Sequence, residues 1–138
     1  MDLGIRFHKE SPFHSRYEFD MEKAFNFMVD LSLRDSACMY ICENGSDEIV
    51  GFIGGELRSS YYTQDKTANE VIFFVDPKHR GGRAAVLLIQ TFEKWAKEHN
   101  AKNMEFGVVT AIHPEKTDNF FKRYGFRYLG GNFYKEVV

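Results

Sequence analysis

The hydrophobic pattern of the chain is most regular between Glu70 and His99. Five consecutive apolar residues, Val71 to Val75, have the length and composition of a strand that is covered on both faces. The run ends at Asp76-Pro77, because proline fixes φ and disfavours helix in the residue before it. Beyond the break, apolar residues recur at steps of three and four, at Ala85, Leu88, Ile89, Phe92, Trp95 and Ala96. The pattern therefore predicts a strand, a turn and an amphipathic helix.

The turn between these two elements is basic and rich in glycine. It contains Lys78, His79, Arg80, Gly81, Gly82 and Arg83. A helix that begins here presents unpaired N–H groups and partial positive charge, which is an arrangement that receives phosphate. A turn that merely reverses the chain is an equal alternative on these grounds. The loop signatures of nucleoside triphosphate and dinucleotide sites are both absent from the sequence, so the turn favours another phosphate ligand.

The residues before this unit predict an edge strand, a helix and a hairpin. Leu3 to His8 alternates enough for a short edge strand, and Asp20 is a suitable N-cap for a helix with an apolar face of Met21, Ala24, Phe25, Met28 and Leu31. Strands are expected over Ala37–Glu43 and Glu48–Leu57, with Gly51, Gly54 and Gly55 indicating a bulge or a close neighbour. The polar stretch from Arg58 to Asn69 is interpreted as a loop, in which Tyr61 and Tyr62 are expected to be solvated or packed at a rim.

After the amphipathic helix, Asn100 ends the pattern and Met104–Val109 predicts a strand with Gly107 inside it. Strand, helix and strand in this order imply a right-handed crossover and a parallel pair. Pro114 is placed to start a last helix, with Phe120, Phe121 and Tyr124 on its apolar face and Gly125 as its stop. Two short closing strands are expected over Arg127–Gly131 and Asn132–Val138.

Composition bounds the class of protein. A chain of 138 residues with 43% hydrophobic and 28% charged residues is expected to form a single globular domain over 1–138. Its net charge of −2 argues against general nucleic-acid binding. Cys38 and Cys42 are expected to be buried free thiols, and the histidines form no ligand spacing, so no metal is expected. No long apolar stretch is present, so we expect a cytoplasmic protein without membrane contact.

Two motifs carry a resemblance to a known family. The run V-D-P-K-H-R-G-G-R-A-A and the later F-F-K-R-Y-G-F resemble the signatures of the Gcn5-related N-acetyltransferase (GNAT) superfamily. Those signatures are Arg/Gln-x-x-Gly-x-Gly/Ala for acetyl-CoA and Phe-Tyr-x-Lys-x-Gly-Phe in the last helix. The resemblance covers the chain from about Tyr40 onward. It implies a mixed α/β fold with a mostly antiparallel twisted sheet, a splayed central parallel pair and flanking helices.

The resemblance also implies a site for acetyl-CoA. Backbone N–H groups of Gly81, Gly82, Arg83, Ala84 and Ala85, with the Arg80 side chain, would hold the pyrophosphate. Arg83 stands where the family has a glycine; its side chain either hinders the backbone or adds a phosphate contact, and we favour the second. The family stabilises the oxyanion with a backbone N–H that falls here at Phe74 or Val75, and the pantetheine arm lies between the two parallel strands.

The implied reaction is acetyl transfer to a primary amine by direct attack in a ternary complex. Glu70 resembles the family's general base, with a solvated strand-end carboxylate as an equal alternative. The family's proton-donating tyrosine aligns with Phe121. Tyr124 is a substitute for it, with a core ring as the favoured alternative for this residue, and water can also protonate the thiolate. Arg83 and Phe121 also motivate an alternative, a catalytically impaired acyl-CoA-binding regulatory or interaction module. The amine acceptor is left open among polyamines, aminoglycosides, amino acids, protein lysines and N-termini. A homodimer is expected because the family often forms one.

Overall fold

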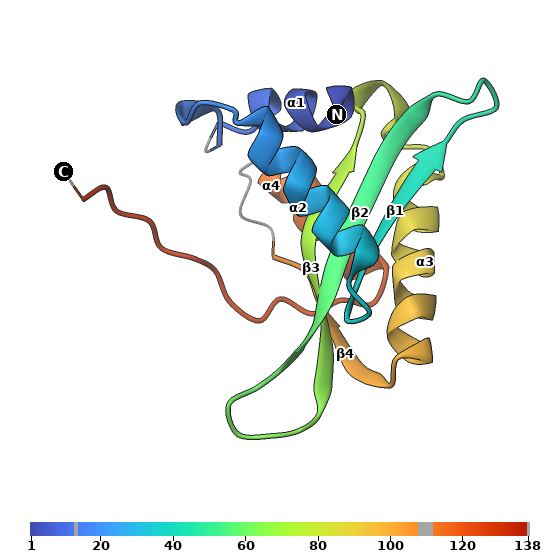
Figure 1. Cartoon of the computed structure of the whole chain (residues 1–138), viewed down its shortest axis with the longest axis vertical. Helices are drawn as coiled ribbons and strands as arrows, with labels where there is room; N and C mark the ends of the chain where they lie inside the picture. Colours follow the sequence, from blue (N-terminus) through green and yellow to red (C-terminus); the bar gives the residue numbers. More distant parts are fainter. Residues whose placement is uncertain (13, 108–111, 138) are drawn as a thin grey trace.

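The computed structural model describes residues 1–12, 14–107 and 112–137. Within these residues, four strands form one sheet in the order β1-β2-β3-β4 (Figure 1). β1 (Ala37–Glu43), β2 (Ile49–Ser59) and β3 (Lys66–Val75) pair antiparallel, and β4 (Ala101–Glu105) joins β3 in parallel. The predicted mixed, mostly antiparallel sheet with one parallel pair is therefore confirmed.

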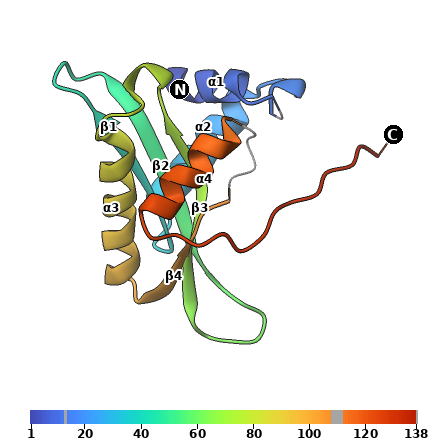
Figure 2. The same cartoon turned by 180° about the vertical axis from the view of Figure 1, so that it is seen from behind.

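Helices cover both faces of this sheet. They are α1 (Asp2–Glu10), α2 (Met21–Leu33), α3 (Ala84–Glu98) and α4 (Pro114–Arg123), with short 3-10 turns η1 (His14–Arg16) and η2 (Pro77–His79). α2 crosses the face seen in Figure 1, and α4 lies on the face seen from behind in Figure 2. In the part of the chain that the structure describes, no helix is long and apolar enough to cross a membrane.

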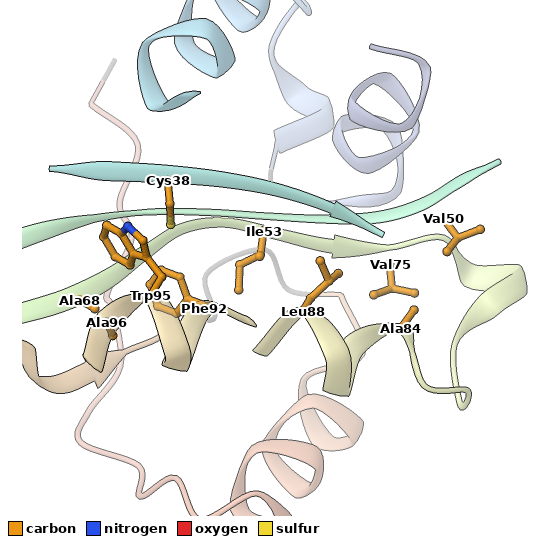
Figure 3. Packing of buried hydrophobic residues seen from close by; sticks show 10 residues of the cluster. All are labelled: Cys38, Val50, Ile53, Ala68, Val75, Ala84, Leu88, Phe92, Trp95 and Ala96. Carbon is orange, nitrogen blue, oxygen red and sulfur yellow. The ribbon is translucent and has the colours of Figure 1, made fainter. Parts of the chain in front are cut away.

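The larger core lies between the sheet and α3. Leu88, Phe92 and Trp95 point from α3 toward the strands, and the Phe92 and Trp95 rings stack with centroids 5.5 Å apart (Figure 3). Gly55 on β2 lies against this helix, because a Cβ built there would be 2.4 Å from Phe92 Cε2. The β2–β3 register shifts between Gly54 and Gly55, so the glycines of β2 mark both the bulge and the close neighbour that the sequence predicted.

The edge strand predicted at the N-terminus is wrong, because these residues form α1. Leu3 and Phe7 are one helical turn apart, and both pack on Phe52 and Phe74 of the sheet. This contact makes a smaller second core on the face opposite α3. Burial of one helical face against distant strands has overridden the local alternation of the sequence.

The predicted α2 helix is confirmed, although its apolar face differs in part. The Asp20 side chain caps the helix by accepting a hydrogen bond from Lys23 N at 2.9 Å. Leu31 is fully buried, whereas Met21 and Phe25 are exposed. The C-terminal end of α2 is therefore packed against the protein, whereas Met21 and Phe25 near its start are open to solvent.

Three boundaries in the central region also differ from the prediction. Half of the polar stretch 58–69 is strand, because β2 runs on to Ser59 and β3 starts at Lys66. These strand ends pair with each other, and Arg58, Ser59 and Lys66 are exposed, so only Ala68 of this stretch is buried in the core. Gly107 follows β4 instead of lying inside it, and Val109 lies outside the described residues. Tyr61 and Tyr62, in the remaining loop, are exposed.

The predicted closing strands are not formed over 127–137, and Val138 lies outside the described residues. This segment leaves the sheet (Figure 1) and exposes Tyr128, Leu129 and Phe133, and near its end Glu136 forms an ion pair with Arg16 of η1 at 3.0 Å. It pairs with none of the described strands, and a lone pair of short strands is marginal in water without a sheet to join. α4 begins at Pro114 and ends just before Gly125, as predicted.

Candidate active site

β3 and β4 run together for only part of their length. Their pairing starts at Lys66 with Ala101 and stops at Asn69 with Glu105. From Glu70 to Val75, β3 keeps β2 on one edge, and no described residue pairs with the other edge. We call residues 70–75 on this side the open edge of β3. The predicted splay of the parallel pair is therefore present, and it begins at Glu70.

Strand alternation decides which backbone groups point into the opening. The Asp76 N–H donates to Val50 O at 2.8 Å, so Phe74, two residues earlier, also directs its N–H toward β2. Val75 lies between them, and its N–H points to the open edge. Val71 has no partner in the β2 register and forms a bulge beside Glu70. Of the two predicted oxyanion positions, the geometry favours Val75 over Phe74.

A cavity of about 670 Å³ follows the open edge. All six residues of the edge line it, together with the glycine turn, the start of α3, one side of α4, and parts of α1 and α2. The cavity brings together most of the predicted site residues: Glu70, Phe74, Val75, Arg80, Gly81, Gly82, Ala85 and Tyr124. Arg83 and Ala84 are not part of its lining, because Arg83 is exposed and Ala84 packs in the core under α3.

The glycine turn leads directly into the N-terminus of α3. Gly81 has φ of 83°, a left-handed conformation that favours glycine, and no other group lies within 4 Å of where its Cβ would be. Arg83 is the N-cap residue, and its side chain makes no capping hydrogen bond. The first N–H groups of this 15-residue helix have no partner within the helix. These backbone donors and the space at Gly81 fit a phosphate group.

Arg80, the predicted phosphate ligand, is already held by α1. Its guanidinium donates to both carboxylate oxygens of Glu10 at 2.6 and 2.7 Å, while its Nε donates to Val75 O at 2.9 Å. The same guanidinium lies over the Phe74 ring, 5.2 Å from the centroid. A second ion pair, Arg6 with Asp76, joins α1 to the start of the turn. The turn is thus clamped by α1, and a phosphate group would share Arg80 with Glu10.

Glu70 lies where β3 parts from β4. One carboxylate oxygen accepts a hydrogen bond from Gly107 N at 3.3 Å, which links the two diverging segments. Burial raises the pKa of Glu70 to about 7, although the Gly107 N–H favours the ionised form. The side chain is half-buried and faces the cavity. A carboxyl group with this pKa can both accept and release a proton near neutral pH.

The two candidate acid positions on α4 have different surroundings. Phe121 is buried and packs against Phe73, Phe106 and Phe126. Tyr124 is half-exposed, lines the cavity, and has its ring 4.9 Å from that of Phe120. Both residues line the cavity, but Phe121 is mostly packed in the core, whereas Tyr124 is the more exposed of the two and carries a hydroxyl group.

Among the described residues, one further cluster of side chains of the metal-binding type lies beside the turn. Glu48, Asp76 and His79 each bring a ligand atom within 4.8 Å of the others, but the Asp76 carboxylate already accepts bonds from Arg6 and from Lys78 N. The expectation of no metal therefore stays a prediction. Cys38 and Cys42 are free cysteines, and burial raises the pKa of the Cys38 thiol to about 12.

The family model of the acetyltransferase (GNAT) family matches residues 5–126. This chain belongs to the GNAT family. Its sequence resemblance is thereby confirmed, and the match extends beyond the motifs to include α1 and α2. The GNAT family uses acetyl-CoA, which carries phosphate groups. The phosphate-compatible turn and the open edge of β3 are therefore consistent with membership of this family.

Solved structures share the fold at low sequence identity. AAC(6')-Iy, in complex with the bisubstrate analog CoA-S-monomethyl-acetylneamine, is 16% identical over 99% of this chain and 91% of its own, with a TM-score of 0.75. The aminoglycoside antibiotic 6'-N-acetyltransferase AAC(6')-IG from Acinetobacter haemolyticus is 15% identical over 100% and 94%, with a TM-score of 0.69. A transcriptional regulator from Bacillus halodurans C-125 is 15% identical over 99% and 93%, with a TM-score of 0.75. A comparison with curated proteins finds no match.

Some residues of the cavity were missed from the sequence. Lys116 and Arg123 of α4 line it and add positive charge, and α1 contributes Phe7 and His8. Lys116 lies four residues before Phe120 and Arg123 three residues after it, so helical spacing could have placed both on the same face of α4. No local signal identified the α1 residues, because they reach the cavity only through long-range packing.

Proposed function

We propose that this GNAT protein transfers an acetyl group from acetyl-CoA to a primary amine by direct attack. The observation that carries the proposal is the position of Glu70. Its carboxylate lies at the parting of β3 and β4, has a pKa near 7, and shares one cavity with the glycine turn. The same proposal includes one domain over 1–138 and a cytoplasmic location, both expected from the sequence, and a homodimer, which the family resemblance implies.

The proposed cosubstrate site uses backbone donors and one guanidinium. Gly81, Gly82 and Ala85 line the cavity at the start of α3, where their N–H groups would bind the pyrophosphate. Arg80 adds a charge-assisted donor next to them. For Arg83 and Ala84 we propose a backbone role alone, since their backbone lies at the start of α3. Amide groups of the pantetheine arm would pair with the open edge of β3, which lacks a strand there.

Glu70 would act as the base. An amine with a pKa near 10 is mostly protonated at pH 7 and cannot attack until it loses a proton. The Glu70 carboxylate would accept that proton, directly or through water, in its ionised form. The nitrogen then forms a bond to the acetyl carbonyl carbon, the bond between that carbon and sulfur breaks, and the sulfur leaves as a thiolate.

Two further groups would assist this transfer. The Val75 N–H, directed to the open edge, would donate to the carbonyl oxygen as negative charge develops there. Tyr124 at the cavity wall, or water, would protonate the thiolate. A thiol with a pKa near 8.5 needs little assistance at neutral pH, so Phe121 does not prevent turnover.

A second candidate is an acyl-CoA-binding module without catalysis. Phe121 is buried at the position of the family's tyrosine, and Glu10 occupies the Arg80 guanidinium. Such a protein would bind acetyl-CoA and release no coenzyme A with any amine.

The test is titration calorimetry with acetyl-CoA, followed by thiol-release assays with a panel of amines. ATP and NAD serve as ligand controls. Arg80→Ala is expected to weaken acetyl-CoA binding about tenfold to a hundredfold. Lys102→Ala, which removes a cation far from the turn, serves as its matched control and should leave binding unchanged. Binding without turnover would favour the second candidate, and failure to bind acetyl-CoA would contradict both.

A further inference from the structure

The cavity has two chemically different walls. The turn and α4 line one wall with the cations Arg80, Lys116 and Arg123. α1, α2 and the segment between them form the other wall, on the face seen in Figure 1. Of the described residues that line this second wall, none is Lys, Arg, Asp or Glu. The cationic wall suits the anionic cosubstrate, which leaves the second wall to face the acceptor.

The second wall is built from ring contacts. The Phe7 centroid lies 5.0 Å from that of Phe74 and 6.0 Å from that of His14, and the Phe19 and His8 centroids are 5.2 Å apart. Burial, and to a lesser degree the neighbouring His8, lower the pKa of His14, so this ring is neutral at pH 7. Phe27, Met28 and Ala24 of α2 complete the surface, which we call the aromatic wall. It offers apolar contact area and no permanently charged side chain.

The charge count of the cavity limits the acceptor further. Among the described lining residues, Glu70 supplies the one carboxylate. It can match the single positive charge that an amine brings. A polyamine or an aminoglycoside brings several ammonium groups, and each additional one would enter a cavity whose described lining offers it cations and no second carboxylate. An unpaired charge away from water is strongly disfavoured.

We infer that the acceptor is a small primary monoamine with an aromatic or branched apolar body. The apolar body lies against the aromatic wall, and the amine lies at Glu70. This inference rests on the proposed acetyl transfer and names the acceptor class. The cavity volume of about 670 Å³ is sufficient for a small ring beside the end of the pantetheine arm.

The first experiment compares kcat/KM of the full chain for 2-phenylethylamine, spermidine, neamine and a short peptide with a free N-terminus. With saturating acetyl-CoA, we expect the value for 2-phenylethylamine to exceed each of the others at least about tenfold. Preference for spermidine, neamine or the peptide would overturn the inference and leave the proposed function intact. If acetyl-CoA binds and none of the amines is acetylated, both fail.

Two variants test the wall itself. Ala24→Asp adds a carboxylate to the aromatic wall, so the ratio of kcat/KM for spermidine to that for 2-phenylethylamine should rise on the order of tenfold. Asn26→Asp makes a charge change on the exposed side of the same helix, outside this cavity, and should leave the ratio unchanged. Equal ratios in the two variants would overturn the inference.

A binding measurement covers the case in which Ala24→Asp fails to fold. Phe27→Ala, at a partly exposed position of the wall, should weaken calorimetric binding of 2-phenylethylamine to the coenzyme A-loaded protein about tenfold. Its affinity for acetyl-CoA should not change. Unaltered 2-phenylethylamine binding in Phe27→Ala would contradict the placement of the ring on this wall.

Discussion

The two halves of β3 have the same strand conformation and the same neighbour β2, but they differ on their other edge. From Lys66 to Asn69, the strand also pairs with β4, and its side chains are mainly polar. From Glu70 to Val75, that second edge is open, the side chains are mainly apolar, and all of them line the cavity. The half that ends at Asn69 uses both backbone edges for the sheet, whereas the half from Glu70 onward has one edge without a described strand partner, where we propose that the cosubstrate binds.

This difference places the chemistry at the boundary between the halves. Glu70 is the first residue without a β4 partner, the Val71 bulge follows it, and Gly107 N reaches back to its carboxylate. A strand with one unpaired edge must satisfy its N–H and C=O groups with water or a ligand. The open half of β3, from Glu70 to Val75, therefore leaves more backbone groups without a strand partner than the paired half does. The cosubstrate would take the place of the missing strand.

The largest effect is expected from Glu70→Gln, which removes the carboxylate at the boundary. We expect kcat/KM to fall about a hundredfold to ten-thousandfold at pH 7.5. In the unmodified chain, activity should rise with pH through about 7 as Glu70 ionises, and the variant should lose this limb. Glu105→Gln changes an exposed carboxylate on β4, opposite Asn69 of the paired half, and as the matched control it should keep both rate and profile. A retained limb in Glu70→Gln would exclude Glu70 as the base.

Gly55→Ala tests the strand opposite Glu70. The added Cβ would meet Phe92 and the backbone oxygen of Asn69 at 2.7 Å, so the free energy of unfolding should fall by about 3 kcal/mol. Urea denaturation measures this loss. Gly45→Ala, where no group lies within 4 Å, should change stability by less than about 1 kcal/mol. Equal losses in the two variants would show that the close approach does not limit packing.

The pH dependence of stability should also reflect Glu70. Its pKa is raised in the folded state, so stability from the protonated form is complete below about pH 4.5 and is lost as pH rises through about 7. Glu70→Gln keeps a neutral side chain, and its stability relative to the parent should improve by about 3 kcal/mol between pH 4.5 and 8. Urea midpoints at both pH values measure the change. A constant difference would contradict the raised pKa.

The smallest effect is expected at the paired end of the strand. Lys102 and Asp65 form an exposed ion pair at 2.9 Å near the start of β4. Lys102→Ala should change the free energy of unfolding by less than about 1 kcal/mol, because exposed pairs are weakened by water and salt. Thermal unfolding at low and high salt is the measurement. A large loss would mean that this end of the sheet depends on charge and not on backbone pairing.

The sequence predicted the fold best where local and tertiary preferences agree. The strand Val71–Val75, the turn and the helix ending at Asn100 are specified by neighbouring residues, and the structure places them as expected. Leu3 to His8 failed because its helix depends on contacts with Phe52 and Phe74, which are remote in sequence. The closing strands failed because alternation alone supplies no partner strand.

The site was predictable in its residue types but not in its interactions. The cations and glycines of the turn are adjacent to one another in the sequence. The Glu70 carboxylate directly precedes the apolar run. The pairing of Arg80 with Glu10 joins residues 70 positions apart, and the Gly107 contact of Glu70 spans 37. Such contacts decide whether a cation is already engaged and whether a carboxylate titrates near pH 7. Both depend on tertiary geometry that periodicity does not encode.

The single tryptophan has an optical consequence. Trp95 is buried against Phe92 on the α3 side of the sheet, and it is not part of the cavity lining. Its fluorescence should therefore report the integrity of the main core and respond little when a ligand fills the open edge. Emission spectra can establish that each variant is folded in the same sample in which acetyl-CoA is titrated.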